Sequence, residues 1–182
     1  EERCLLNYVA ELIADGHFAK ALTVVEGRGH SFWVDRPGFL DRFAQWEVCR
    51  LMAELGARVD AVQSTLKKTP AAATKWVEAY AQEDGWHQAD RAQRSLEAWI
   101  VTMEDEPEEP LQRALALTRN IYENLLKDMA TGFTQALTAF AWAAQGALQQ
   151  TQIYPDLVEP CGGRVAYFFV DAMRFEMGVD LV

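Results

Sequence analysis

The longest periodic stretch of the sequence runs from Leu111 to Phe140, where large side chains recur every three or four residues. This spacing predicts one long α helix with a single apolar side. If the helix continues unbroken to Gln149, it is ~60 Å long at ~1.5 Å per residue, and Gly132 is the position where we expect a kink. A stripe of this length needs a bundle of shorter helices against it, and the alternative is a coiled-coil dimer.

Shorter segments upstream show the same spacing and would cover that stripe. An αα-hairpin is predicted at residues 4–14 and 18–25, because Asp15-Gly16 breaks the periodicity between them. Three further helices are predicted. The first follows Pro37 and runs to about Leu55, where Gly56 interrupts it. The second has Thr69 as its N-cap and Pro70 as its first residue and ends at Gly85, and the third runs from Trp86 to Met103.

The character of the sequence changes after residue 150. Residues 151–163 contain two prolines and two glycines and are predicted to form a linker. The apolar run between Arg164 and Asp171 is short and rich in aromatic and β-branched residues, which is typical of a central strand of a parallel sheet. A helix is predicted for residues 172–182, and a strand followed by a helix is half of a βαβ unit.

The predicted fold class is therefore mainly α. A helical domain, either a bundle or an array, is expected over residues 1–150, followed by the linker. Residues 164–182 are expected to be the truncated start of an α/β domain, whose partner strands lie outside this chain. The chain also begins at Glu1 rather than at a methionine, so we expect it to be a piece of a longer protein.

Charge and cysteine usage argue against several classes of function. Lysine and arginine number 17 and aspartate and glutamate 27, so the formal net charge is −10, and no basic stripe offsets it. We therefore expect no direct nucleic acid binding. No run of about eighteen apolar residues is present, so no membrane span is expected. The three cysteines lack CxxC spacing, which favours reduced, buried thiols in a cytoplasmic protein over a zinc site.

Asp171 is the candidate functional residue that the pattern itself singles out. It follows the predicted strand and precedes the predicted helix, and the carboxyl ends of parallel strands form the edge where α/β sheets bind ligands. A carboxylate there is a hard oxygen donor suited to a divalent metal. The alternative is that Asp171 caps the following helix, because aspartate is a favoured N-cap residue.

The segment RVAYFFVDAMRFEMGVDL, residues 164–181, resembles the opening of PglZ domains, which typically read as a hydrophobic strand followed by D-A-L-R-Y-E. PglZ domains belong to the alkaline phosphatase superfamily, so the resemblance implies that Asp171 is a metal ligand. Arg174 and Glu176 match the motif as well, and helix packing or a salt bridge is the favoured interpretation for both.

Two upstream segments resemble the helical region that precedes PglZ domains. They are HSFWV at residues 30–34 and YAQEDGWHQADRAQRSLEAW at residues 80–99. In the second segment we expect packing roles, with Trp86 in the core and Asp90 and Arg94 as an i, i+4 pair.

The resemblance implies that the chain is the N-terminal part of a PglZ-like protein of bacterial phage defence, in the Pgl and BREX systems. Such proteins act alongside a DNA methyltransferase and ATPases. The complete protein would be a metal-dependent phosphatase or phosphodiesterase that uses a divalent metal, zinc or manganese, and its helical part would be a protein-docking scaffold. The alternative is a helical protein-interaction or regulatory module with no hydrolase activity.

The chain is not expected to be a working enzyme by itself. In the superfamily, the Thr or Ser nucleophile and the further Asp and His ligands fall on later strands, so no two-metal site forms from Asp171 alone. His17, His30 and His87 have no acidic partner at ligand spacing and are not expected to replace those ligands. We therefore expect no catalytic residue and no bound metal within these residues.

Overall fold

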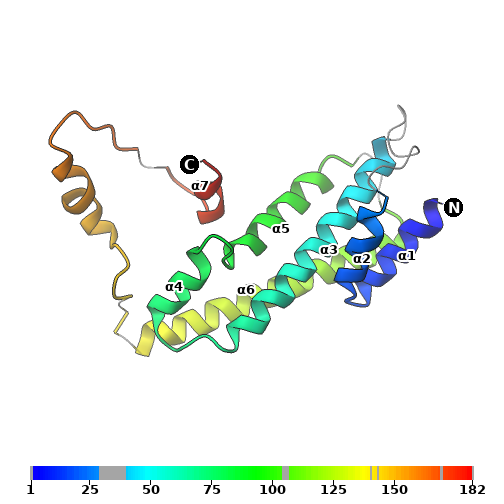
Figure 1. Ribbon diagram of the computed structural model, residues 1–182, viewed down its shortest axis with the longest axis horizontal. Helices are drawn as coiled ribbons and strands as arrows, with labels where there is room; N and C mark the ends of the chain where they lie inside the picture. The colour runs from blue at the N-terminus through cyan, green and yellow to red at the C-terminus, as the bar shows by residue number, and fades with distance from the viewer. Residues whose placement is uncertain are drawn as a thin grey trace. The chain divides into compact units, whose positions relative to one another are not determined.

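The computed structural model describes residues 2–28, 40–103, 107–139, 141–142, 144–168 and 170–181, and it is mainly α, as predicted (Figure 1). In chain order the α helices are α1 (Glu2–Ala14), α2 (Phe18–Glu26), α3 (Leu40–Leu66), α4 (Ala73–Ala81), α5 (His87–Ile100), α6 (Glu109–Ala139) and α7 (Phe175–Leu181). Short 3-10 and π turns cover Gln150–Gln152, Tyr154–Val158 and Glu159–Cys161.

The chain divides into two compact units. The first comprises Glu1–Lys68 with Gln88–Thr131, and the second comprises Thr69–His87 with Gly132–Val182. The boundary predicted between a helical domain and a linker at residue 150 stays a prediction.

The first unit is built on the predicted αα-hairpin. Helices α1 and α2 contact each other, and both contact α3. The part of the apolar stripe of α6 that lies in this unit is buried as its spacing predicts, and its members are Leu111, Leu115, Thr118, Tyr122, Leu125 and Met129. Farther along α6, Phe133 and Leu137 are only half-buried. The core is therefore made by the helical faces that the periodicity of the sequence indicates.

The helix α6 is shorter than the longest extent predicted for it. It ends at Ala139 rather than Gln149 and is therefore about 46 Å long at ~1.5 Å per residue. Ala141 and Trp142 adopt left-handed φ angles of 52° and 64°, and the Trp142 N–H donates to the Leu137 carbonyl at 2.8 Å. A left-handed backbone with such a bond closes the carbonyl end of a helix. Phe140 lies outside the described residues.

Two glycines predicted to disturb helices lie inside unbroken ones. Helix α3 continues through Gly56, so the interruption predicted there was wrong. Helix α6 continues through Gly132, and the kink predicted at Gly132 stays a prediction. In the first unit, a Cβ at Gly56 would collide with Cδ1 of the Phe18 ring. In the second unit, a Cβ at Gly132 would collide with Cη2 of the Trp76 ring. Both glycines therefore admit an aromatic ring against a helix backbone.

The second unit contains α4, the turn into α5 and the C-terminal segment with α7. Helix α4 begins at Ala73, and its N-cap is Ala72, which forms no side-chain capping bond, so the predicted start at Thr69-Pro70 was wrong. The Pro70 carbonyl instead accepts a hydrogen bond from Trp76 Nε1 at 3.0 Å. Trp76 in turn meets Trp86 edge to face, with ring centroids 5.3 Å apart.

The strand predicted between Arg164 and Asp171 is not formed. Residues 164–168 and 170 have no regular secondary structure, and the part of the chain that the structure describes contains no β strand. The physical reason is that a strand is held by a ladder of hydrogen bonds to a neighbouring strand. The helix predicted after it is present as α7, although it begins at Phe175 rather than Ala172.

Candidate functional site

Asp171 lies in an exposed turn that leads into α7. Its Oδ1 accepts a hydrogen bond from the Ala172 N–H at 2.8 Å, and Ala172 has a left-handed φ of 56°. The Arg174 carbonyl accepts the first helical hydrogen bonds, from Met177 and Gly178, each at 3.1 Å. Asp171 therefore does not cap α7, and the capping interpretation was wrong.

The other two residues of the motif differ sharply in their surroundings. Arg174 is exposed. Glu176, in the first turn of α7, has only 1% of its surface exposed. The burial of Glu176 agrees with a packing role, whereas the exposure of Arg174 leaves its side chain at the surface.

Phe175 lies against two rings that flank the turn between α4 and α5, Tyr80 near the end of α4 and His87 at the start of α5, all within the second unit. Its ring centroid is 5.6 Å from that of Tyr80 and 5.1 Å from that of His87. Interplanar angles of 59° and 73° give the tilted and edge-to-face arrangements that aromatic pairs prefer. The structure therefore brings the Asp171 motif next to the segment that carries Gly85-Trp86.

His87 is a fixed part of this turn. Its side chain is 1% exposed, and its Nδ1 lies 2.7 Å from the Tyr80 carbonyl oxygen. Because a carbonyl oxygen only accepts, Nδ1 carries the proton of this bond. His17 is exposed at the start of α2 and makes no side-chain cap, and His30 lies outside the described residues.

Gly85 is required by the backbone of the same turn. A Cβ at this position would collide with the Tyr80 carbonyl oxygen and would lie 2.7 Å from that of Gln82. The Gly85 N–H donates to Gln82, and the Trp86 N–H donates to Ala79. Trp86 is buried, as predicted. The Gly-Trp pair thus has a structural explanation: Gly85 allows a tight turn, and the turn places the Trp86 indole in the core.

Asp90, from the same upstream segment, has a buried partner in the first unit. The Tyr122 hydroxyl donates to its Oδ1 at 2.8 Å. The predicted pairing of Asp90 with Arg94 stays a prediction. The bond to Tyr122 links α5 to α6 and could not be read from the sequence, since the two residues are 32 positions apart.

A metal site requires more than Asp171. Among the described residues, no group of three or more His, Cys, Asp or Glu side chains is arranged to hold a metal ion. Divalent cations in proteins take several ligands, so one exposed carboxylate does not form a site by itself.

The cysteines differ from the prediction that all three are buried. Cys49 is buried, but Cys4 and Cys161 are exposed. Burial raises the pKa of the Cys49 thiol to about 12.

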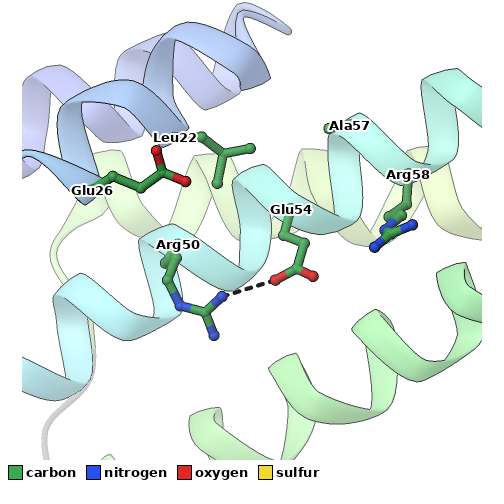
Figure 2. Close-up of a pocket in the computed structure, with 6 residues that line it drawn as sticks. All are labelled: Leu22, Glu26, Arg50, Glu54, Ala57 and Arg58. Atoms are coloured by element: carbon green, nitrogen blue, oxygen red, sulfur yellow. Dashed lines mark hydrogen bonds and ion pairs between the residues drawn. The ribbon is translucent and has the colours of Figure 1, made fainter. Parts of the chain in front are cut away.

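The first unit also contains a cleft between α2 and α3 that the sequence did not predict (Figure 2). Its volume is about 400 Å³, and its lining residues are Leu22, Glu26, Arg50, Glu54, Ala57 and Arg58. Arg50 forms ion pairs with Glu47 at 2.6 Å and Glu54 at 2.9 Å, and these raise its pKa. Two arginines and two glutamates give the lining no net charge, so the cleft has no evident preference for a charged ligand.

Comparisons of the chain with protein-family models, with curated proteins and with solved structures found no match. No helix in the described part of the chain has both the length and the apolar character needed to cross a bilayer.

Proposed function

We propose that this chain is the helical docking scaffold and the opening segment of a PglZ-like, metal-dependent phosphatase or phosphodiesterase of the cytoplasm. The proposal starts from the resemblance of residues 164–181 to the opening of PglZ domains. In this proposal the helices bind other proteins of a phage-defence system, with a methyltransferase and ATPases as the partners that the resemblance implies.

The observation that supports this proposal is the contact between Phe175 and the α4–α5 turn. Phe175 belongs to the D-A-M-R-F-E motif, and Tyr80 and His87 belong to the upstream segment with the second resemblance. Phe175 thus meets the first part of the upstream segment, residues 80–87, within one compact unit. Such a contact is expected if the helical region and the motif fold as one structural unit.

Asp171 has a defined part in the proposed activity. Its exposed carboxylate supplies one oxygen ligand, and the remaining ligands come from later strands of the complete protein. A bound zinc or manganese ion would supply Lewis-acid chemistry to a phosphate ester. The Ala172 N–H donates to Oδ1 and so orients the carboxylate.

The test compares Asp171→Asn with the unchanged protein, made from the complete reading frame. Asparagine has a similar shape but no charge, so we expect an unchanged melting temperature, loss of bound metal by mass spectrometry, and loss of bis-p-nitrophenyl phosphate hydrolysis by orders of magnitude. Asp156→Asn, at another exposed aspartate, is the matched control and should retain both metal and activity. Full activity in Asp171→Asn would overturn the proposal.

A helical interaction module without hydrolase activity is the second candidate, and the exposed apolar side chains near the C-terminus favour it. Phe168, Val170 and Leu181 are 81%, 58% and 75% exposed, and large exposed apolar side chains favour an interaction role in which a partner covers them. In this case the complete protein carries no metal and hydrolyses no phosphate ester, and Asp171→Asn does not change its stability.

A further inference from the structure

Residues 165–170 lack the features by which proteins keep an exposed strand from pairing with another chain. They include no charged residue, no proline and no glycine, and apart from Ala166 their side chains are β-branched or aromatic. Six-residue segments of this composition are those most prone to pair as strands with another chain. Val165, Phe168 and Val170 are exposed, so the segment presents apolar side chains that a partner strand would cover.

One basic and one acidic residue frame this segment. Arg164 precedes it and Asp171 follows it, and both side chains are exposed. Two copies paired as antiparallel strands can place Arg164 of each copy opposite Asp171 of the other, which joins opposite charges at both ends. Two copies paired in parallel and in register would instead place each charge opposite its like, which is unfavourable. The charges therefore favour one orientation and one register.

The same register also matches the apolar side chains. It places Val165 opposite Val170 and Tyr167 opposite Phe168, and each pair occurs twice because both copies contribute both members. Opposite side chains of an antiparallel pair lie on the same face and contact each other, and aromatic pairs are among those that stabilise a sheet. The segment is therefore complementary to itself along its whole length.

We propose that residues 164–171 pair, as an antiparallel strand, with the same segment of a second copy of this chain. A strand is held by hydrogen bonds to a neighbouring strand. The part of the chain that the structure describes contains no such neighbour, and a second copy supplies it. The proposal goes beyond the proposed function and does not rest on Asp171 as a metal ligand.

The assembly is expected to be a transient pair. Opposite positions in this register are always one odd and one even number, so the two copies pair through different edges and each keeps one edge free. A third copy would leave the sheet at the same end as the first, only ~9.6 Å from it, which is less than the ~10–12 Å diameter of one helix. Crowding thus opposes growth, and two strands bury less surface than a stable dimer needs.

The first measurement is sedimentation of the 182-residue chain over a series of protein concentrations. We expect the average mass to rise toward that of a dimer, and Arg164→Asp to weaken self-association at least about tenfold, because it places like charges at both ends of the pair. Combining Arg164→Asp with Asp171→Arg exchanges the charges and should restore the association. Arg174→Asp makes the same charge change at an exposed residue outside the segment and is the matched control, which should associate like the unchanged chain.

The second measurement tests the register by disulfide trapping, which captures a transient pair. Cys4→Ser and Cys161→Ser first remove the two exposed thiols, while the buried Cys49 stays. Chains with Val165→Cys and chains with Val170→Cys are then mixed and oxidised. Opposite residues of an antiparallel pair have Cα atoms ~4.5–5.5 Å apart, within the range of a disulfide. We expect the mixed disulfide to form at least about fivefold faster than either chain links to its own kind.

Four results would overturn the proposal. They are a chain that stays monomeric at every concentration, an Arg164→Asp variant that associates as well as the unchanged chain, an equal loss of association in Arg174→Asp, and faster linkage of Val165→Cys chains to one another than to Val170→Cys chains. The last result would show a parallel pair. Far-UV circular dichroism of each variant should match that of the unchanged chain, so that a loss of association reports on the pairing and not on unfolding.

Discussion

The three cysteine thiols lie in different environments, and this makes their reactivity a test of the fold at the scale of single residues. Cys4 and Cys161 are exposed, while Cys49 is buried with a pKa raised to about 12. The thiolate is the reactive form of cysteine. At about pH 8 almost no Cys49 is present as thiolate, because its pKa is far above that pH. We expect Ellman's reagent to modify two thiols rapidly and the third only after unfolding.

The control for this prediction is Cys49→Ala. It should leave the rapid count at two and remove the thiol that unfolding releases. Three rapidly reacting thiols in the unchanged chain would show that the α3 core is open around Cys49.

Gly56→Ala is expected to destabilise the first unit. The added Cβ would collide with the Phe18 ring, and overpacking of this kind costs ~1–3 kcal/mol of unfolding free energy. A urea titration should show a lower midpoint with an unchanged slope, and Phe18→Leu in the same chain should recover part of the loss. Gly27→Ala meets its nearest atom at 3.4 Å and should change the midpoint little; equal losses in both variants would be inconsistent with the explanation.

Whether the burial of a residue could be predicted from the sequence depends on what determines its surroundings. Trp86 was correctly placed in the core, because burying a large indole removes much apolar surface from water. Cys4 was not correctly placed, because a small thiol on a helix is tolerated on either face. The burial of Glu176 could not be read from its residue type, because glutamate is almost never fully buried.

At the scale of elements, the pairing of α5 with α6 includes a two-pronged ion pair. Arg119 donates from Nε and Nη2 to the two carboxylate oxygens of Glu97, at 2.8 Å and 2.6 Å. The hydrogen bond from Arg119 is the main cause that lowers the Glu97 pKa, against desolvation, which raises it. Because the folded pKa lies below the unfolded value, the unfolded chain binds more protons as the solution is acidified.

The pair therefore stabilises the fold at neutral pH and loses its contribution as pH falls below the unfolded value of about 4.5 and through the folded pKa. Both side chains are about two-fifths exposed, so the contribution at pH 7 should be at most about 1 kcal/mol. Urea titrations of Glu97→Gln should show this loss at pH 7 and little difference from the unchanged chain at about pH 3. Arg119→Gln added to Glu97→Gln should cost little more, and additive losses would contradict the pairing.

The elements that the sequence predicted well are those whose formation is local. The apolar spacing that predicts α1, α2, α5 and α6 is satisfied within each helix and against neighbouring helices. The segment 164–170 has equally strong strand character, but a strand needs partners from elsewhere, and the described chain offers none. Gly56 was misinterpreted for a related reason, because the Phe18 ring that occupies its place comes from another helix.

The net charge of the whole molecule bears on whether it binds nucleic acid. The formal net charge is −10, and several cations already face carboxylates in the described structure: Arg3, Arg28, Arg50, Lys75 and Arg119. A cation in an ion pair loses part of its attraction for a phosphate. This surface should therefore attract a nucleic acid only weakly.

We accordingly predict that the chain does not bind duplex DNA at physiological salt. Non-specific binding draws its free energy from counterions that lysine and arginine displace from phosphates, and it reaches Kd values of ~10⁻⁴–10⁻⁶ M in proteins that present a basic surface. A chain with ten more acidic than basic residues and no basic stripe should fall outside that range. Fluorescence anisotropy of a labelled duplex should show no saturation up to about 100 µM protein. A submicromolar Kd that weakens steeply with added salt would contradict this and would show that paired arginines such as Arg119 exchange their carboxylates for phosphates.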